Sequence, residues 1–197
     1  MATNFRTDDD LEVALYYLQR GRDALVWKVE GLSEYDARRP MTGTGTNLLG
    51  VVKHVAITEH GYLGELLGHS IELPPSWEDE EANSDMWVRP EESSQLVLNT
   101  YRAVWANSDA TVRRLGLDAP AEVPWWPEER RRVSARLLLL HMTIETHRHA
   151  GQADIVRESI DGLVGMQPAN SNLPEQDEPS WAAYRDRLEE AARAAQG

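Results

Sequence analysis

The feature that most constrains this chain is the recurrence of apolar residues at helical spacing along several long stretches. In the first stretch the apolar positions lie three, four or seven residues apart, which places them on one face of an α-helix. They are Leu11, Leu15, Leu18, Leu25 and Val29. The acidic residues Asp8, Asp9 and Asp10 precede them, where carboxylates cap a helix and complement its positive end. We therefore predict a first helix from about residue 9 to 30.

The same pattern predicts three further helices. Thr46 or Asn47 can cap the second, which covers roughly 47–68, and the third covers about 91–115. A long fourth helix ends near Gly162, and its inward face carries Leu138, Met142, Val156 and Ile160. Alternation of apolar and polar residues is too short for a substantial sheet. The predicted fold class is thus all-α, an up-down four-helix bundle.

The C-terminal part differs in composition. Residues 165–178 are rich in Pro, Asn and acidic residues, and an amphipathic segment with Trp181, Tyr184 and Leu188 on one side follows. We predict one domain, with the bundle in 1–164 and a linker and appended helix in 165–197. That helix is expected to pack on the outside of the same domain.

Composition excludes several partners. The net charge of -13, from 33 acidic and 20 basic residues, would repel a phosphate backbone, so nucleic acid is not expected to bind. The arginines of 130–132 are interpreted as part of a solvated loop. No stretch is long and apolar enough to span a membrane, and the N-terminus lacks the apolar core of a secretory signal. We predict a cytoplasmic protein.

The chain contains no cysteine. It therefore has no disulfide, thiolate ligand or cysteine nucleophile, and any thiol chemistry must use an external thiol. The long acidic segment after Gly68 is either a functional lid or a solvated loop, and both interpretations stay open. Its residues Trp77 and Trp87 either line a pocket mouth or anchor the loop.

Glu145 and His149 carry the chemistry of the fourth helix. They lie four residues apart, which gives a rotation of about 40° and a rise of about 6 Å, so both side chains share one face. This face continues the apolar stripe, where a carboxylate needs a partner or a metal ion. An ordinary helical ion pair has the same spacing, so spacing alone leaves both interpretations open.

A third ligand has to come from another helix. His54 lies among apolar residues at helical spacing in the second helix and is the best candidate. His141, one turn before Glu145, is a competing ligand, a residue that holds Glu145, or a core histidine. His147 lies on the opposite side of the helix from Glu145, and we interpret it as a surface residue. His60 and His69 are also expected to be exposed.

Two segments resemble a known family. HMTIETHRHAGQADIVRESIDG, residues 141–162, resembles the fourth helix of the DinB/YfiT-like superfamily of metal-binding bundles, particularly its actinobacterial branch. NLLGVVKHVAITEHGYL, residues 47–63, is similar to the second helix of that superfamily. The resemblance implies an up-down-down-up four-helix bundle that holds zinc or nickel through His54, Glu145 and His149. Many members have a third histidine where this chain has Glu145, whereas mycothiol-dependent isomerases and S-transferases have a carboxylate.

Three protein ligands leave a coordination position open, as a catalytic metal requires. The leading hypothesis is a divalent-metal-dependent transferase or isomerase that activates a small, mycothiol-like thiol toward an electrophilic small molecule. Arg148 and Arg157 are candidates for substrate positioning, although a structural role is preferred for both. A metal-dependent hydrolase and a non-catalytic stress-response binding module are the alternatives. Similar bundles are commonly homodimers, and we expect one here.

Overall fold

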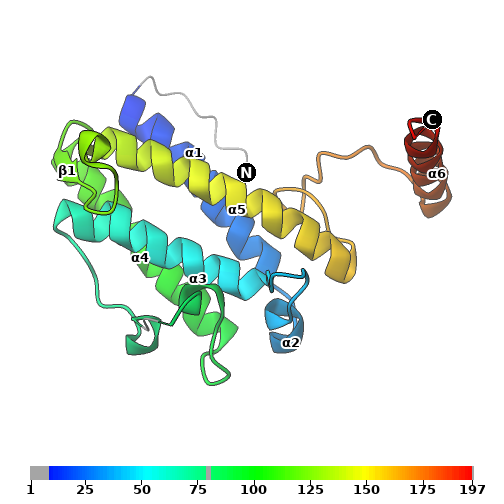
Figure 1. The fold of residues 1–197 in the computed structure, drawn as a ribbon, viewed down its shortest axis with the longest axis horizontal. Helices are drawn as coiled ribbons and strands as arrows, with labels where there is room; N and C mark the ends of the chain where they lie inside the picture. Colours follow the sequence, from blue (N-terminus) through cyan, green and yellow to red (C-terminus); the bar gives the residue numbers. More distant parts are fainter. Residues whose placement is uncertain (1–8, 79–80, 197) are drawn as a thin grey trace.

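Long α-helices dominate the structure (Figure 1). A computed structural model describes residues 9–78 and 81–196, and these residues form six α-helices and one two-stranded sheet. The helices are α1 (Asp10–Val29), α2 (Glu34–Arg38), α3 (Leu48–Glu59), α4 (Ser94–Leu115), α5 (Ala135–Asp161) and α6 (Glu178–Ala194). The strands β1 (Pro120–Glu122) and β2 (Arg132–Ser134) pair antiparallel. The all-α prediction is confirmed.

The ends of the helices follow from local chemistry. The carboxylate of Asp9 accepts hydrogen bonds from two backbone N–H groups in the first turn of α1, and Asn47 caps α3 in the same way. Gly116 and Gly162 end α4 and α5 with φ angles of 80° and 78°, which side chains other than glycine rarely adopt. Asp8, also expected to act at the first cap, lies outside the described residues.

Pairs of long helices form the core. In Figure 1, α5 runs beside α1, while α3 packs against both α4 and α5. The helices α1, α3, α4 and α5 each bury one apolar face, as periodicity predicts, and the buried side chains include Leu18, Leu25, Val55, Tyr101, Leu138 and Met142. The contact between α3 and α5 matters most for function, because these helices carry the predicted metal ligands.

The second helix is less regular than predicted. It ends at Glu59 and continues as a π-helical turn, His60–Gly64, and a 3-10 turn, Glu65–Leu67. The expectation that His60 is exposed is wrong, because its ring is buried and Nε2 donates a hydrogen bond to the carbonyl oxygen of Ile71, 2.8 Å away. His69 is half-buried. The irregular backbone thus lets a polar ring be buried with its hydrogen bond satisfied.

Helix α6 stands apart from the other helices in Figure 1. It is capped by Asp177, and Trp181 and Tyr184 pack edge to face with ring centroids 6.0 Å apart. None of its residues is buried. Its predicted packing on the same domain therefore stays a prediction.

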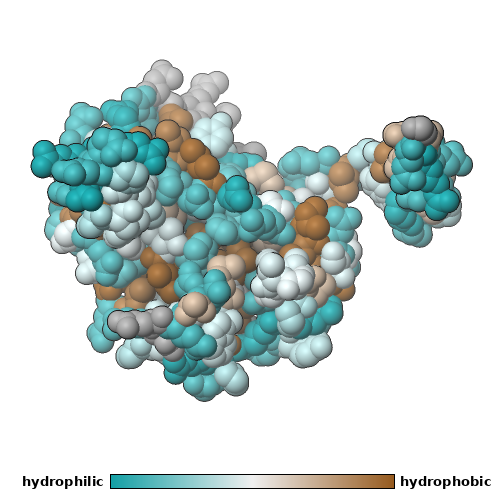
Figure 2. Space-filling view, in the orientation of Figure 1, coloured by the Kyte–Doolittle hydropathy of each residue, from teal (hydrophilic) through white to brown (hydrophobic). Residues whose placement is uncertain are grey.

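Most of the face shown in Figure 2 is hydrophilic, and hydrophobic side chains gather over part of α5. Leu137, Leu140, Ile144 and Ile155 of that helix are exposed. Within residues 9–78 and 81–196, no helix has the length and apolar character needed to cross a membrane.

A buried ion pair connects three helices. The Arg22 guanidinium of α1 binds both carboxylate oxygens of Glu59 in α3, at 2.6 and 3.2 Å, and Asp109 of α4 at 2.8 Å. The side chains of Arg22 and Glu59 are fully buried. Charged groups in such a place are stable only when each finds its partner, so this contact fixes the relative positions of α1, α3 and α4.

Glu59→Ala should lower the free energy of unfolding by about 3–5 kcal/mol, because it leaves the buried Arg22 charge without its main partner. Glu12→Ala is the matched control, since Glu12 binds Arg113 across α1 and α4 at the surface, 2.9 Å away. It should cost less than about 1 kcal/mol. Urea unfolding at neutral pH measures both values, and equal losses would contradict this role for Glu59.

Candidate metal centre

His54 and His149 meet between α3 and α5. Their ring centroids lie 4.8 Å apart at an interplanar angle of 69°. His54 belongs to the second predicted helix and His149 to the fourth, so the two residues are separated by most of the chain. The structure therefore brings together two of the three predicted ligands.

Each imidazole is held through its Nδ1 atom. His54 Nδ1 donates to the carboxylate of Asp85, 2.6 Å away, and His149 Nδ1 donates to the side-chain oxygen of Gln152, 2.9 Å away. Within the described ranges, neither Nε2 atom makes a hydrogen bond. A ring held at Nδ1 by an oxygen acceptor, with Nε2 available for coordination, is the usual arrangement of a metal-binding histidine.

Glu145 lies beside the two histidines but does not complete a three-ligand metal site with them. Its Oε2 atom is 3.8 Å from Nε2 of His149, and 32% of its side chain is exposed. The expectation that this carboxylate is buried is therefore only partly correct, and its desolvation is milder than the sequence suggested. In the described part of the chain, no three His, Asp or Glu side chains gather closely enough to hold a metal as they lie.

The donor set nevertheless suits a zinc-like ion. Two imidazoles and a carboxylate are ligands that zinc and nickel accept. Burial lowers the pKa of His149 below its ordinary value of 6.5, and the neighbouring His54 lowers it further. His149 is therefore neutral near pH 7, in the form that can bind a metal. Rotation of Glu145 toward the two rings would complete the set.

His141 occupies a different environment. Its ring packs edge to face against Tyr62 and Trp126, with centroid distances of 4.8 and 5.3 Å. The Tyr62 hydroxyl accepts hydrogen bonds from the indole nitrogens of both Trp125 and Trp126, at 3.1 and 3.2 Å. His141 thus belongs to an aromatic cluster beside the histidine pair, and its predicted role as an additional ligand stays a prediction.

The two candidate arginines differ in their surroundings. Arg148 is exposed, and its role in substrate positioning stays a prediction. Arg157 is buried, binds Asp161 at 2.7 Å and donates to the backbone oxygens of Lys28 and Glu30 at 3.0 Å. Its partner is Asp161 rather than Asp154, which pairs with Lys28. These contacts favour the structural interpretation of Arg157.

His147 is half-buried rather than at the surface. Its Nε2 atom donates to the backbone oxygen of Tyr17 in α1, 2.9 Å away. It lies away from the histidine pair, as helical phase predicted, because it faces α1.

A comparison with known protein families matches the part of the chain that carries the site. A sequence profile of mycothiol S-transferases matches residues 14–162. This chain belongs to the mycothiol S-transferase family. The matched range begins within α1, contains α2 to α5 and all three predicted ligands, and leaves α6 outside. The resemblance to the DinB/YfiT-like superfamily is confirmed.

Two further comparisons, with proteins of curated function and with solved structures, give less information about this chain. No protein of curated function matches the sequence. A crystal structure of a conserved protein from Enterococcus faecalis is similar, with a TM-score of 0.62 at 15% identity over 80% of this chain and 100% of that one. At that identity the similarity concerns the fold alone.

Sequence analysis missed Asp85. It lies in the acidic loop between α3 and α4, which was interpreted as either a solvated loop or a lid. The structure supports anchoring for Trp77, which is buried and donates from its indole nitrogen to Glu92, 2.9 Å away, whereas Trp87 is exposed. One acidic residue among several in a loop gave no signal that it would meet His54.

Gly50 lets this loop lie directly on α3. A Cβ atom at Gly50 would stand 1.9 Å from the backbone oxygen of Met86. Asn47 and Lys53, on the same face of α3, donate to the backbone oxygens of Met86 and Trp87 at 3.1 and 3.0 Å. Asp85 is therefore placed against His54 by backbone contacts of its own loop.

Gly50→Ala should detach the loop segment around residues 84–87, although alanine favours the helix itself by about 1 kcal/mol. Hydrogen exchange of this segment should become faster while exchange in α5 stays unchanged. Gly151→Ala is the control, because a Cβ atom there would meet no neighbour within 4 Å. Unchanged exchange of residues 84–87 in Gly50→Ala would contradict this loop placement.

Proposed function

We propose that this protein is a divalent-metal-dependent S-transferase that joins a small, mycothiol-like thiol to an electrophilic small molecule. The proposal rests on the contact between His54 and His149, whose ring centroids lie 4.8 Å apart, in a chain that belongs to the mycothiol S-transferase family. An isomerase that uses the thiol as a cofactor would need the same site. The up-down-down-up bundle, a cytoplasmic location and a homodimer are part of this proposal.

His54, His149 and Glu145 would hold the metal, with zinc the first choice and nickel the second. When bound, such an ion lowers the pKa of a thiol and stabilises the thiolate at its open coordination position. Asp85 and Gln152 keep the rings of His54 and His149 oriented, because each accepts a hydrogen bond from an Nδ1–H group. The partly exposed Glu145 would turn toward the two rings to bind the ion, and its charge would offset that of the cation.

The external thiol follows from composition. The chain has no cysteine, so a sulfur nucleophile has to arrive as a cosubstrate. His149 is neutral near pH 7 because burial and His54 lower its pKa, and it therefore adds no positive charge against a metal. The exposed edge of the histidine pair gives a thiol access from solvent, since neither ring is fully buried.

Metal analysis tests the ligands. The wild-type protein should bind one zinc or nickel ion per chain, and His54→Ala and His149→Ala should each lose it. Asp85→Asn should weaken binding by about 10–100-fold, as loss of an outer hydrogen-bond partner typically does. His69→Ala, which changes a half-buried histidine outside the site, should bind normally. Stoichiometric metal in both the His54 and His149 variants would refute the site.

Electrophile consumption tests the reaction. The metal-loaded protein should consume a small electrophile, such as monobromobimane, faster with mycothiol than with glutathione, and not above background without a thiol. His149→Ala should lose this activity, whereas His69→Ala should keep it. Product formation without any thiol would support the metal-dependent hydrolase. Stoichiometric binding of the electrophile without turnover would support the non-catalytic binding module.

A further inference from the structure

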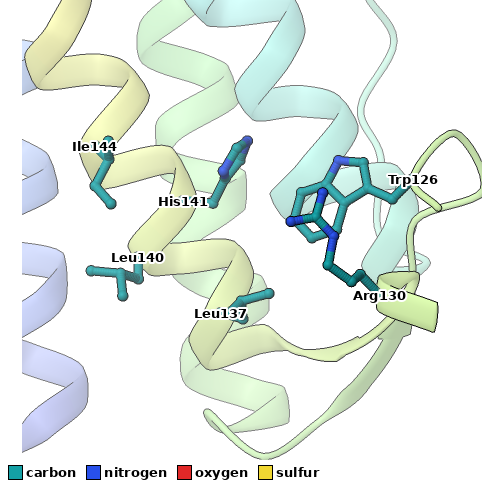
Figure 3. A pocket seen from close by; sticks show the side chains of 6 residues that line it. All are labelled: Trp126, Arg130, Leu137, Leu140, His141 and Ile144. Atoms are coloured by element: carbon teal, nitrogen blue, oxygen red, sulfur yellow. The ribbon is translucent and has the colours of Figure 1, made fainter.

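An open pocket of about 590 Å³ lies beside the aromatic cluster on the outer side of α5. Leu137, Leu140 and Ile144 line it from α5, and Trp126 lines it from the loop between β1 and β2, with His141 between Trp126 and the two residues Leu140 and Ile144 in the view of Figure 3. The volume falls in the range of about 300–1,000 Å³ typical of small-molecule sites. The pocket is therefore large enough for one aromatic or branched aliphatic group.

The α5 wall is unusually apolar for a surface. Leu137, Leu140 and Ile144 are 43%, 56% and 58% exposed. Isolated exposed apolar residues are ordinary, but three on one helix face around a cavity mark a binding surface. Two polar side chains also line the pocket, Arg130 and His141.

Arg130 has no carboxylate partner among the described residues. Arg131 pairs with Glu122 at 3.9 Å and Arg136 with Asp10 at 3.1 Å. Arg132 also lacks a carboxylate partner among the described residues, but it does not line the pocket. In Figure 3 the Arg130 side chain overlaps the Trp126 ring in projection, and both residues line the pocket. A guanidinium there can bind a carboxylate or sulfonate in two-pronged fashion while its neighbours contact an apolar group.

The pocket is connected to the histidine pair through His141. This residue lines the pocket, contacts Trp126 and lies one helical turn before Glu145. A molecule in the pocket would therefore reach toward Glu145 and His149 along the same helix. Glu145 lies one turn and His149 two turns, about 12 Å, further along α5 than His141, which suits a substrate whose reactive end extends beyond its apolar body.

We propose that this pocket binds the electrophilic substrate, and that the substrate is a small molecule with an aromatic or branched apolar body and an anionic group that pairs with Arg130. This inference rests on the proposed function, because it assigns the second substrate of the same reaction. Trp126 and Ile144 contact the apolar body, and Arg130 selects its charge. The alternative is that a second copy of the chain, rather than a small molecule, covers the apolar residues Leu137, Leu140 and Ile144 of α5.

Binding of naphthalene-1-carboxylate to the metal-free full-length protein, measured by calorimetry without thiol, tests the pocket. The carboxylate should bind about fivefold more tightly than the neutral naphthalene-1-methanol, as expected for one exposed ion pair. Arg130→Gln should abolish this difference without weakening the alcohol. Arg132→Gln, two residues away at the surface, should leave both affinities unchanged.

The apolar wall has its own matched pair of variants. Ile144→Ser should weaken both probes, whereas Ile155→Ser, which changes an equally exposed isoleucine of α5 outside the pocket, should weaken neither. No binding by the wild type at millimolar probe, or equal losses in the two variants, would overturn the proposal. A dimer that excludes the probe and separates in Ile144→Ser would assign the wall to a second copy instead.

These results are independent of the metal and thiol experiments. Loss of probe binding with retained metal and thiol-dependent activity would reject only the pocket. Retained probe binding in a protein that binds no metal would reject the proposed S-transferase and the role of the ligand as its electrophile, and would leave a pocket that selects an anionic, apolar ligand. If both hold, Arg130→Gln should raise the KM for an anionic electrophile and leave kcat unchanged, which a purely structural role of Arg130 would not do.

Discussion

The buried Arg22 guanidinium imposes the constraint on which the packing of the long helices depends. A charge in the core is tolerated only if carboxylates surround it, and Glu59 and Asp109 come from two different helices. Because Glu59 is the last residue of α3, the contact fixes that helix at the point where the regular backbone ends. The position of α3 then determines where His54 lies relative to α5.

The candidate site extends this arrangement toward solvent. The contact between α3 and α5 brings His54 to His149, and the loop on Gly50 adds Asp85 to the outer side of His54. The histidine pair is thus supported on two sides, by a helix and by a loop whose backbone is hydrogen-bonded to α3. Such outer contacts orient metal ligands as strongly as the ligands' own helices do.

Polar and apolar side chains lie on different faces of α5, so the candidate metal ligands and the pocket lie on neighbouring faces of this helix. Glu145 and His149 face α3, while Leu137, Leu140 and Ile144 face the pocket. His141 lies between these two faces and contacts the aromatic cluster of Tyr62 and Trp126. In the proposed reaction, α5 would hold the metal on one face and the apolar substrate on the next, because successive faces of a helix are only a few residues apart.

The sequence by itself determined the positions of the long helices, most of their caps, and the shared face of Glu145 and His149, because these depend on contacts within about one helical turn. It also indicated His54, through a family resemblance that extends over two separate helices. Only the tertiary structure decided that Asp85 holds His54, that His60 is buried, and that Glu145 is one-third exposed. These outcomes depend on how a loop and a π-helical turn pack against distant helices, and no local spacing encodes such long-range contacts.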